Sequence, residues 1–178
     1  GLSFHDNLEL FKEIVDDLTD LKKLNEIRFG EDVFCCLGTT IKKAGTKSQF
    51  EKIDHDLPVE IGKICEKKKV KHYLVISSTG SNAGSKNFYL RTKGRMEEAV
   101  KRLKISQITI GRPSMLLGNR REYRFGEEMG KIGMKIFKPL LSGKRKKYRA
   151  IQADVVARAM IIIANSSPTS QVIFESNE

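Results

Sequence analysis

The sequence is poor in the residues that mark several protein classes: it has no tryptophan, three cysteines and four prolines among 178 residues. The cysteines are odd in number and form no CxxC pair, which argues against a disulfide framework and a structural metal site. No apolar run approaches the roughly 18 residues of a membrane-spanning helix, and no secretory signal is recognisable at the start. These absences predict a protein of a reducing, intracellular compartment, which we expect to be the cytoplasm.

Positive charge is abundant: 33 Lys and Arg against 22 Asp and Glu give a net charge of +11. Such an excess favours phosphorylated or polyanionic partners, although solvated helix faces are the more common explanation of it. We do not expect nucleic-acid binding, because no recognisable motif accompanies the lysines. The run expected to contact an anion or a protein partner is Lys144, Arg145, Lys146, Lys147 and Arg149.

Short apolar runs alternate with helical patterns along the whole chain. This alternation predicts βαβ units in one Rossmann-like α/β domain spanning residues 1–178, with a doubly wound parallel sheet. The run at 32–37 is continuously apolar, as in a strand buried on both faces. The expected strands cover residues 13–15, 32–37, 72–77, 105–111 and 171–174. The expected helices cover residues 19–27, 56–68, 87–103, part of 125–137 and part of 153–165.

Ligands of such sheets bind beyond the carboxyl ends of the strands, so the loops at 38–48, 78–86 and 112–124 are the candidate binding loops. In the helix after the second of these, Tyr89 and Lys93 are four residues apart and share one face. A phenol titrates near pH 10, and a neighbouring ammonium favours its ionised form, which makes it a usable general acid. The alternative is a surface tyrosine beside one of many lysines.

Two further groups follow strand ends. Ser77 and Ser78 end the strand at 72–77, where a hydroxyl could orient a substrate oxygen, although the same residues also suit a plain turn. Arg112, Pro113 and Ser114 end the next strand, where they could turn the chain over a flat ligand or simply leave the sheet. All three groups should lie on one edge of the sheet.

In this order the motifs resemble the short-chain dehydrogenases/reductases, and within them the atypical branch that includes the HIV Tat-interactive protein. The likeness runs from about residue 10 to residue 165. It is carried by FCCLGTT at 34–40, Ser77-Ser78 followed by Gly80, FYLRTKG at 88–94, and Arg112-Pro113-Ser114.

The resemblance implies an NAD(P)(H)-dependent oxidoreductase that acts on a carbonyl or hydroxyl substrate, with NADP(H) preferred to NAD(H) and no metal. It implies that Ser78, Tyr89 and Lys93 are catalytic. The dinucleotide contacts that it implies are Asp17, Leu18, Leu37, Gly38, Thr39, Ser77, Lys93, Arg112, Pro113 and Ser114. The alternative is a non-catalytic regulator or scaffold that senses the dinucleotide and binds a partner through the basic run.

The chain departs from the family in two ways. No Gly-x-x-Gly-x-x-Gly loop occurs in it, although this loop binds the pyrophosphate in the family. We therefore expect a fold truncated at the N-terminus, without the first strand, the first helix and most of the second strand. The asparagine that assists catalysis in extended members also has no counterpart near residues 52–54.

Overall fold

The computed structural model describes residues 21–27, 29–117, 150–166 and 172–175. The strand expected at 13–15, the helix expected within 125–137 and the basic run at 144–149 lie outside the described residues.

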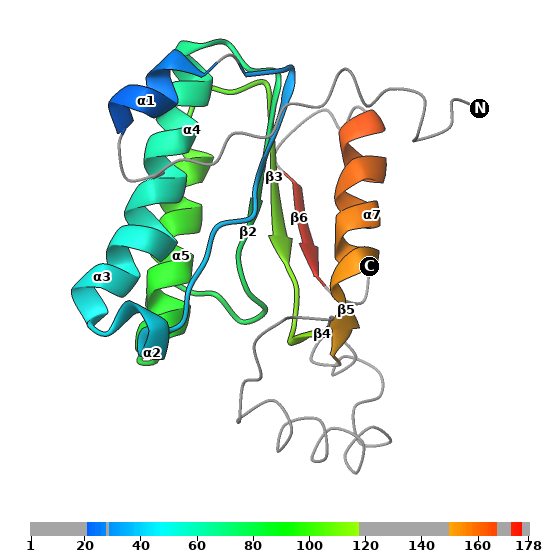
Figure 1. The fold of residues 1–178 in the computed structure, drawn as a ribbon. Coiled ribbons are helices and arrows are strands. Elements are labelled where there is room, and N and C mark those ends of the chain that lie inside the picture. The colour runs from blue at the N-terminus through cyan, green and yellow to red at the C-terminus, as the bar shows by residue number, and fades with distance from the viewer. Residues whose placement is uncertain (1–20, 28, 118–149, 167–171, 176–178) are drawn as a thin grey trace.

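A parallel four-stranded sheet forms the centre of the molecule (Figure 1). Its order is β1-β2-β3-β6, and every neighbouring pair is parallel. A separate two-stranded pair, β4 with β5, lies beyond the carboxyl ends of these strands (Figure 1). Four of the expected strands are confirmed, with shifts of one or two residues at their ends. The bounds are β1 (Asp32–Cys35), β2 (His72–Ile76), β3 (Gln107–Arg112), β4 (Leu116–Leu117), β5 (Ile151–Gln152) and β6 (Val172–Glu175).

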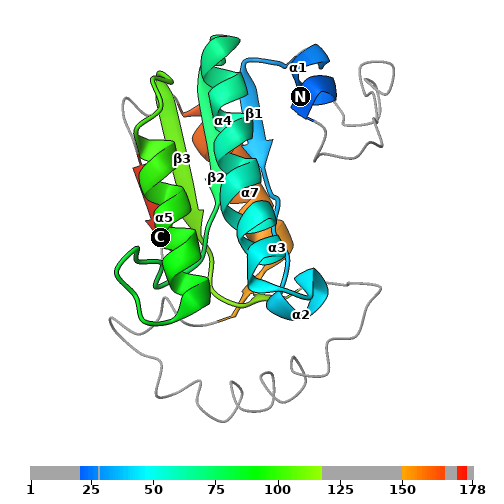
Figure 2. The ribbon, with the colours of Figure 1, turned by 90° about the vertical axis from the view of Figure 1, so that its left-hand side faces the viewer.

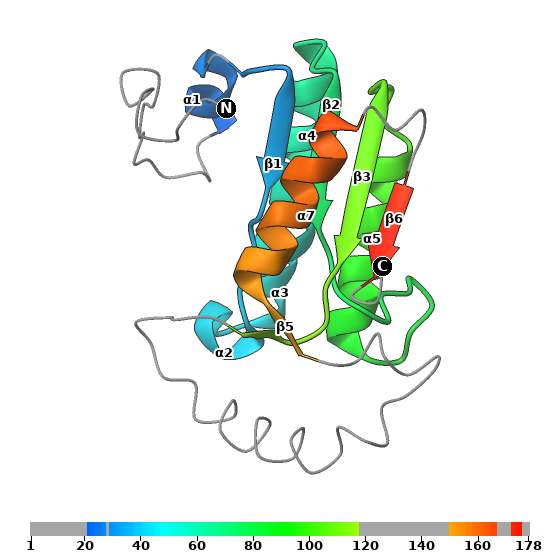
Figure 3. The same cartoon turned by 90° about the vertical axis from the view of Figure 1, so that its right-hand side faces the viewer.

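Helices cover both faces of the sheet, as the doubly wound prediction requires. On one face lie α4 (Leu57–Lys67) and α5 (Phe88–Lys101), with α1 (Leu21–Glu26) packed against α4 (Figure 2). On the other face lies α7 (Ala153–Asn165), which packs against β2 (Figure 3). The helices expected at 87–103 and 153–165 are confirmed.

The core lies mainly between the sheet and the α4/α5 layer. Side chains alternate along a strand, so Tyr73 and Val75 of β2 point to this layer and are 0% and 1% exposed. The Tyr73 hydroxyl donates to the carbonyl oxygen of Pro58 at 2.7 Å, which satisfies the one polar atom of that buried ring. Most of the remaining core residues are apolar side chains of α4, α5 and β3, and Leu24 of α1, Cys35 of β1 and Val70 before β2 complete the core.

The strand β1 contradicts the expectation of burial on both faces. Its residues are exposed, half-buried, exposed and buried in turn, and Phe34 keeps 42% of its surface exposed. Within the described residues β1 is the end strand of the sheet, and α7 packs against the neighbouring β2. Phe34 therefore lacks the cover that a central strand would have.

The helix expected from residue 56 begins earlier. The chain is helical through α3 (Lys47–Glu51), a π-helical turn η2 (Lys52–Asp56) and then α4. Part of the loop expected at 38–48 also forms α2 (Ile41–Ala44). Thr40 and Thr46 start these short helices, because their hydroxyls accept from the amides of Lys43 and Gln49.

Candidate functional site

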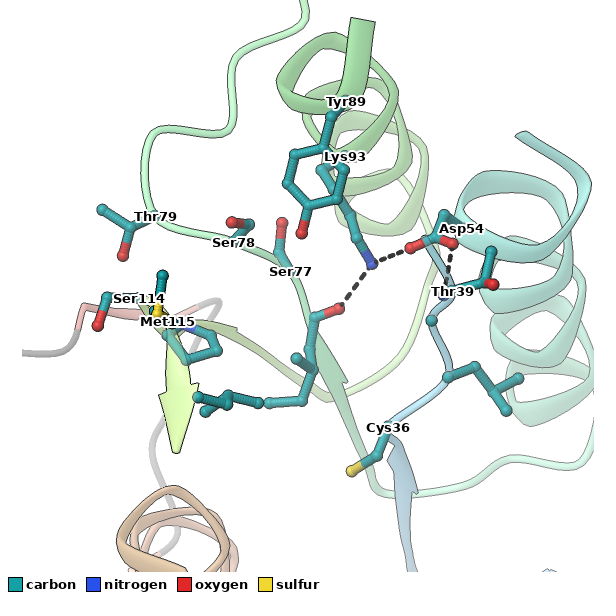
Figure 4. A pocket seen from close by; sticks show the side chains of 15 residues that line it. Cys36, Thr39, Asp54, Ser77, Ser78, Thr79, Tyr89, Lys93, Ser114 and Met115 are labelled. Atoms are coloured by element: carbon teal, nitrogen blue, oxygen red, sulfur yellow. Dashed lines mark hydrogen bonds and ion pairs between the residues drawn. The ribbon is translucent and has the colours of Figure 1, made fainter. Parts of the chain in front are cut away.

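A pocket of about 490 Å³ opens at the carboxyl ends of β1, β2 and β3, where the three loops meet (Figure 4). This is the edge of the sheet at which the sequence predicts the site. Its lining residues are Cys36, Leu37, Gly38, Thr39, Asp54, Ile76, Ser77, Ser78, Thr79, Tyr89, Lys93, Pro113, Ser114, Met115 and Leu116.

The helix α5 brings Tyr89 and Lys93 to the pocket. Asn87 caps this helix by accepting from the Leu90 amide at 3.1 Å, which fixes where its first turn begins. One turn separates the two side chains, and both extend from α5 into the pocket (Figure 4). The Tyr89 ring packs on Phe50 of α3 with 5.7 Å between centroids. The predicted shared face is confirmed.

The loop after β2 places the two serines differently. Ser77 is 4% exposed, and its hydroxyl pairs with that of Ser81 at 3.0 Å. Ser78 is half-buried and lines the pocket, and its hydroxyl has no hydrogen bond within the described part of the chain. Of the two, Ser78 has the hydroxyl that is available to a ligand.

This loop lies directly on α5 because Gly94 has no side chain. A Cβ at Gly94 would come under 3.0 Å from backbone atoms of Asn82 and Ala83. The turn itself needs Gly80, whose φ is +83°. Hydrogen bonds from Thr79 to the carbonyl oxygens of Arg112 and Pro113, at 2.8 and 3.0 Å, tie it to the loop after β3. The position of Ser78 next to Tyr89 therefore depends on two glycines.

An acidic residue that sequence reasoning missed lies beside Lys93. Asp54 is 1% exposed, and its Oδ1 is 2.9 Å from the Lys93 Nζ. Its Oδ2 accepts from the Thr39 amide at 2.8 Å. Residues 52–54 hold a carboxylate, that of Asp54, and no asparagine. The signal in the sequence is weak, because two acidic residues, Asp54 and Asp56, stand between Ile53 and the apolar start of α4.

The expected dinucleotide contacts divide into three groups. Leu37, Gly38, Thr39, Ser77, Lys93, Pro113 and Ser114 all line the pocket. Asp17 and Leu18 lie outside the described residues. Arg112 does not line the pocket, and its guanidinium binds the buried Glu97 carboxylate through two hydrogen bonds of 2.9 and 2.5 Å. Hydrogen bonding to Glu97 raises the pKa of Arg112, and the ion pair of these two residues joins α5 to β3.

Part of the pocket wall is apolar, formed by Leu37, Ile76, Pro113, Met115 and Leu116, and Cys36 adds a thiol to it. Desolvation raises the pKa of the Cys36 thiol, with a smaller contribution from Cys35. Cys36 is therefore a neutral wall residue at neutral pH and a poor nucleophile. A phenol, a hydroxyl and an ammonium thus face a partly apolar cavity. This arrangement could bind a carbonyl oxygen and deliver a proton to it.

The chain resembles known proteins over most of its length. The family model described as HIM1 matches residues 4–146. The protein HTATIP2 of Rattus norvegicus is 34% identical over 157 residues, covering 86% of this chain and 63% of that protein. The mitochondrial protein fmp52 of Aspergillus fumigatus is 36% identical over 124 residues, covering 70% of this chain and 53% of that protein. The chain thus spans less than two thirds of these curated relatives.

Solved structures share the fold. The enzyme WbmH of Bordetella bronchiseptica, solved with NAD+, has a TM-score of 0.65 at 11% identity, with 97% of this chain and 64% of that chain covered. UDP-glucose 4-epimerase of Thermotoga maritima, solved with UDP-glucose, has a TM-score of 0.64 at 12% identity, with 92% and 62% covered. The Rossmann-like fold class that the sequence predicts is therefore confirmed.

The expectation of a cytoplasmic protein is wrong. Fungal relatives with 34–40% identity carry names that place them in mitochondria. The inference failed because unpaired cysteines indicate a reducing compartment without saying which one. Among the described helices, none has the length and apolar character to span a bilayer.

Proposed function

The chain belongs to the HIM1 family, whose curated relatives are HTATIP2-like atypical short-chain dehydrogenases/reductases, and we propose that its pocket carries out nicotinamide-dependent oxidoreduction of a carbonyl or hydroxyl compound. The observation that carries this proposal is the meeting of Ser78, Tyr89 and Lys93 in one pocket at the carboxyl ends of parallel strands. Ser78 comes from the loop after β2, and Tyr89 and Lys93 come from α5. Proximity along the chain alone therefore does not explain why the three side chains share one pocket.

The described residues fit the reacting half of a nicotinamide dinucleotide. Lys93 has three N–H donors, of which Asp54 takes one and the Ile76 carbonyl oxygen, at 3.5 Å, weakly takes a second. The third is available to a ribose hydroxyl. At the end of β1 the exposed Gly38 has no side chain to block a ligand, and Pro113 offers a flat wall.

When bound, the dinucleotide gives or accepts a hydride at its nicotinamide ring. In the reducing direction we assign the proton to Tyr89, whose phenol would give it to the carbonyl oxygen of the substrate. Ser78 donates a hydrogen bond to the same oxygen and so orients it. The positive charge of Lys93 stabilises the phenolate that remains.

The proposal covers nicotinamide dinucleotides as a class. NADP(H) was expected in preference to NAD(H) from the family resemblance, and the preference stays a prediction. Structures that share the fold were solved with NAD. This supports a nicotinamide dinucleotide as the cofactor, but it does not support a preference for NADP(H), which carries an additional phosphate. Titrating the full-length protein with both reduced cofactors decides between them.

The test is oxidation of NADPH or NADH by the full-length protein with a panel of aldehydes, ketones and quinones. Tyr89→Phe removes the proton donor and should lower kcat by about 10²- to 10⁴-fold, with the dinucleotide Kd nearly unchanged. The matched control is Tyr73→Phe, which removes a phenol hydroxyl that lies in the core and bonds Pro58. That variant should lose stability and keep its kcat.

Turnover that survives Tyr89→Phe would refute the assigned roles. Dinucleotide binding without any turnover would instead support the non-catalytic, sensing alternative.

A further inference from the structure

The acidic residue beside Lys93 stands in the one π-helical turn of the described chain. Residues 47–67 are helical throughout, and in η2 the Leu57 amide donates to the Lys52 carbonyl oxygen. Pro58 has no N–H to donate to the Asp54 carbonyl oxygen four residues back, so a regular α-helix would be broken there. A π-turn changes the direction of the side chains it holds and is frequent at functional sites. Here it aims Asp54 into the pocket (Figure 4).

The two carboxylate oxygens of Asp54 bind two different elements. Oδ1 pairs with the Lys93 ammonium of α5 at 2.9 Å, and Oδ2 accepts from the Thr39 amide, in the loop after β1, at 2.8 Å. Both partners can only donate. A carboxylate satisfies both at once, whereas an amide side chain would turn its NH₂ group toward one of them.

Burial makes this contact important for the charge of the amine. The side chains of Lys93 and Asp54 are 4% and 1% exposed. An ammonium that is withdrawn from water without a counter-ion is strongly disfavoured and tends to lose its proton. Asp54 is therefore the buried counter-ion of Lys93 and also fixes the position of its amine.

The loop after β1 lies close to this pair. A Cβ added at Gly38 would be 3.3 Å from the Asp54 Oδ1 and 3.8 Å from the Lys93 Nζ. A ligand bound against Gly38 and Thr39 would therefore lie in contact with the ion pair. Any shift of the Thr39 amide would also change its hydrogen bond to the Asp54 carboxylate.

We propose that Asp54 is a positioning residue of this site: its carboxylate joins the loop at Gly38 and Thr39 to Lys93, supplies the counter-charge of the buried amine and aims it at the pocket. The inference rests on the proposed function, because Lys93 is taken to bind the dinucleotide and assist Tyr89. It couples binding at the loop to the proton chemistry of the reaction.

The experiment compares Asp54→Asn with Asp56→Asn in the full-length protein. Asp56 is in the same helical turn, but it is 60% exposed and pairs with His55. Asp54→Asn should weaken dinucleotide binding by about tenfold and lower kcat. It should also move the alkaline limb of the kcat–pH profile of carbonyl reduction to lower pH by about one unit or more, because a nearby negative charge favours the protonated forms. Asp56→Asn should leave the dinucleotide Kd, kcat and the alkaline limb unchanged.

A second variant separates charge from shape. Asp54→Glu keeps the negative charge on a longer side chain, so it should restore the position of the alkaline limb while the Kd stays weakened. A normal limb position and Kd in Asp54→Asn, with only a lower melting temperature, would make the residue merely structural and overturn the inference while the proposed function stands.

A readout that needs no turnover keeps the two hypotheses apart. Lys93 can be modified by an amine-selective reagent over a range of pH, with the extent at that residue measured by mass spectrometry. Only the unprotonated amine reacts, so Asp54→Asn should shift the modification of Lys93 to lower pH, and Asp56→Asn should not. An unshifted profile refutes the inference, and a shifted profile without any dinucleotide binding supports the charge role while the proposed function fails.

Discussion

The strands β2 and β3 are buried on both faces, since Leu74, on the face opposite Tyr73, is also 0% exposed, but the helices on the two faces are packed to very different degrees. Under α4 and α5 the inward side chains of β2 and β3 are fully buried: Tyr73, Val75, Ile108 and Ile110 are all 0% or 1% exposed. On the other face Met160 is the only buried residue of α7. Three large apolar side chains of that helix stay exposed: Val155 at 47%, Ile161 at 54% and Ile162 at 68%.

This contrast explains where the site stands. The helix α5, which carries Tyr89 and Lys93, belongs to the well-packed face, where Met96 and Val100 on its inner side are 0% exposed. A reactive group must be held within a fraction of an ångström to be useful. The face with the complete core holds the candidate acid and amine, and α7 supplies no residue to the pocket lining.

The largest expected effect compares one isoleucine from each face. Ile110→Ala empties a site in the packed core and should lower the free energy of unfolding by about 2–5 kcal/mol. Ile162→Ala removes a side chain that is mostly in solvent and should change it by less than about 0.5 kcal/mol. Chemical denaturation of both variants measures the difference. Equal losses would mean that α7 is covered in the full-length protein, and the comparison of the faces would fail.

A smaller effect is expected where the site loop meets α5. Gly94→Ala would push a methyl group into the backbone of Asn82 and Ala83, and overpacking of this kind costs about 1–3 kcal/mol. Because the loop also holds Ser78, the proposed kcat should fall with stability. Gly84→Ala, in the same loop, meets only the Asn82 Oδ1 at 3.4 Å and is the matched control. A stable Gly94→Ala variant with unchanged kinetics would show that the loop can move without consequence.

The parts of the site that follow from local pattern were predictable from the sequence. The spacing of Tyr89 and Lys93 fixes a shared face once the segment is a helix, and a strand followed by Ser77-Ser78 puts the serines at its carboxyl end. The order and direction of the strands also follow from alternating strands and helices.

What the sequence could not show depends on contacts between distant elements. Asp54 reaches Lys93 only because a π-turn rotates it inward, and no periodicity signals such a turn. Arg112 lies at the expected strand end, yet its guanidinium binds the buried Glu97 of α5 and does not line the pocket. The exposure of Phe34 depends on which strand is central, which an apolar run does not reveal.

The smallest expected effect concerns a polar group buried on the face of α7. His72 at the start of β2 is 1% exposed; its Nε2 lies 2.8 Å from the Thr109 hydroxyl, and its Nδ1 has no hydrogen bond among the described residues. Burial lowers the pKa of His72, and the Asp32 carboxylate, 3.9 Å away, opposes this in part. The imidazole is therefore neutral in the folded protein at neutral pH.

The sign of the pH dependence follows from that lowered pKa. Above about pH 6.5 His72 is neutral in both states and contributes no pH dependence. Below it the unfolded chain takes up the proton first, so stability falls as the pH drops toward the lowered pKa of the folded state, by at most about 1.4 kcal/mol per unit. His72→Gln should flatten this decline between about pH 6.5 and pH 5, as measured by denaturation at each pH. The control is His55→Gln, in the half-buried π-turn, which should not flatten the decline in stability. If the decline persists in His72→Gln, acidic groups elsewhere in the protein cause it.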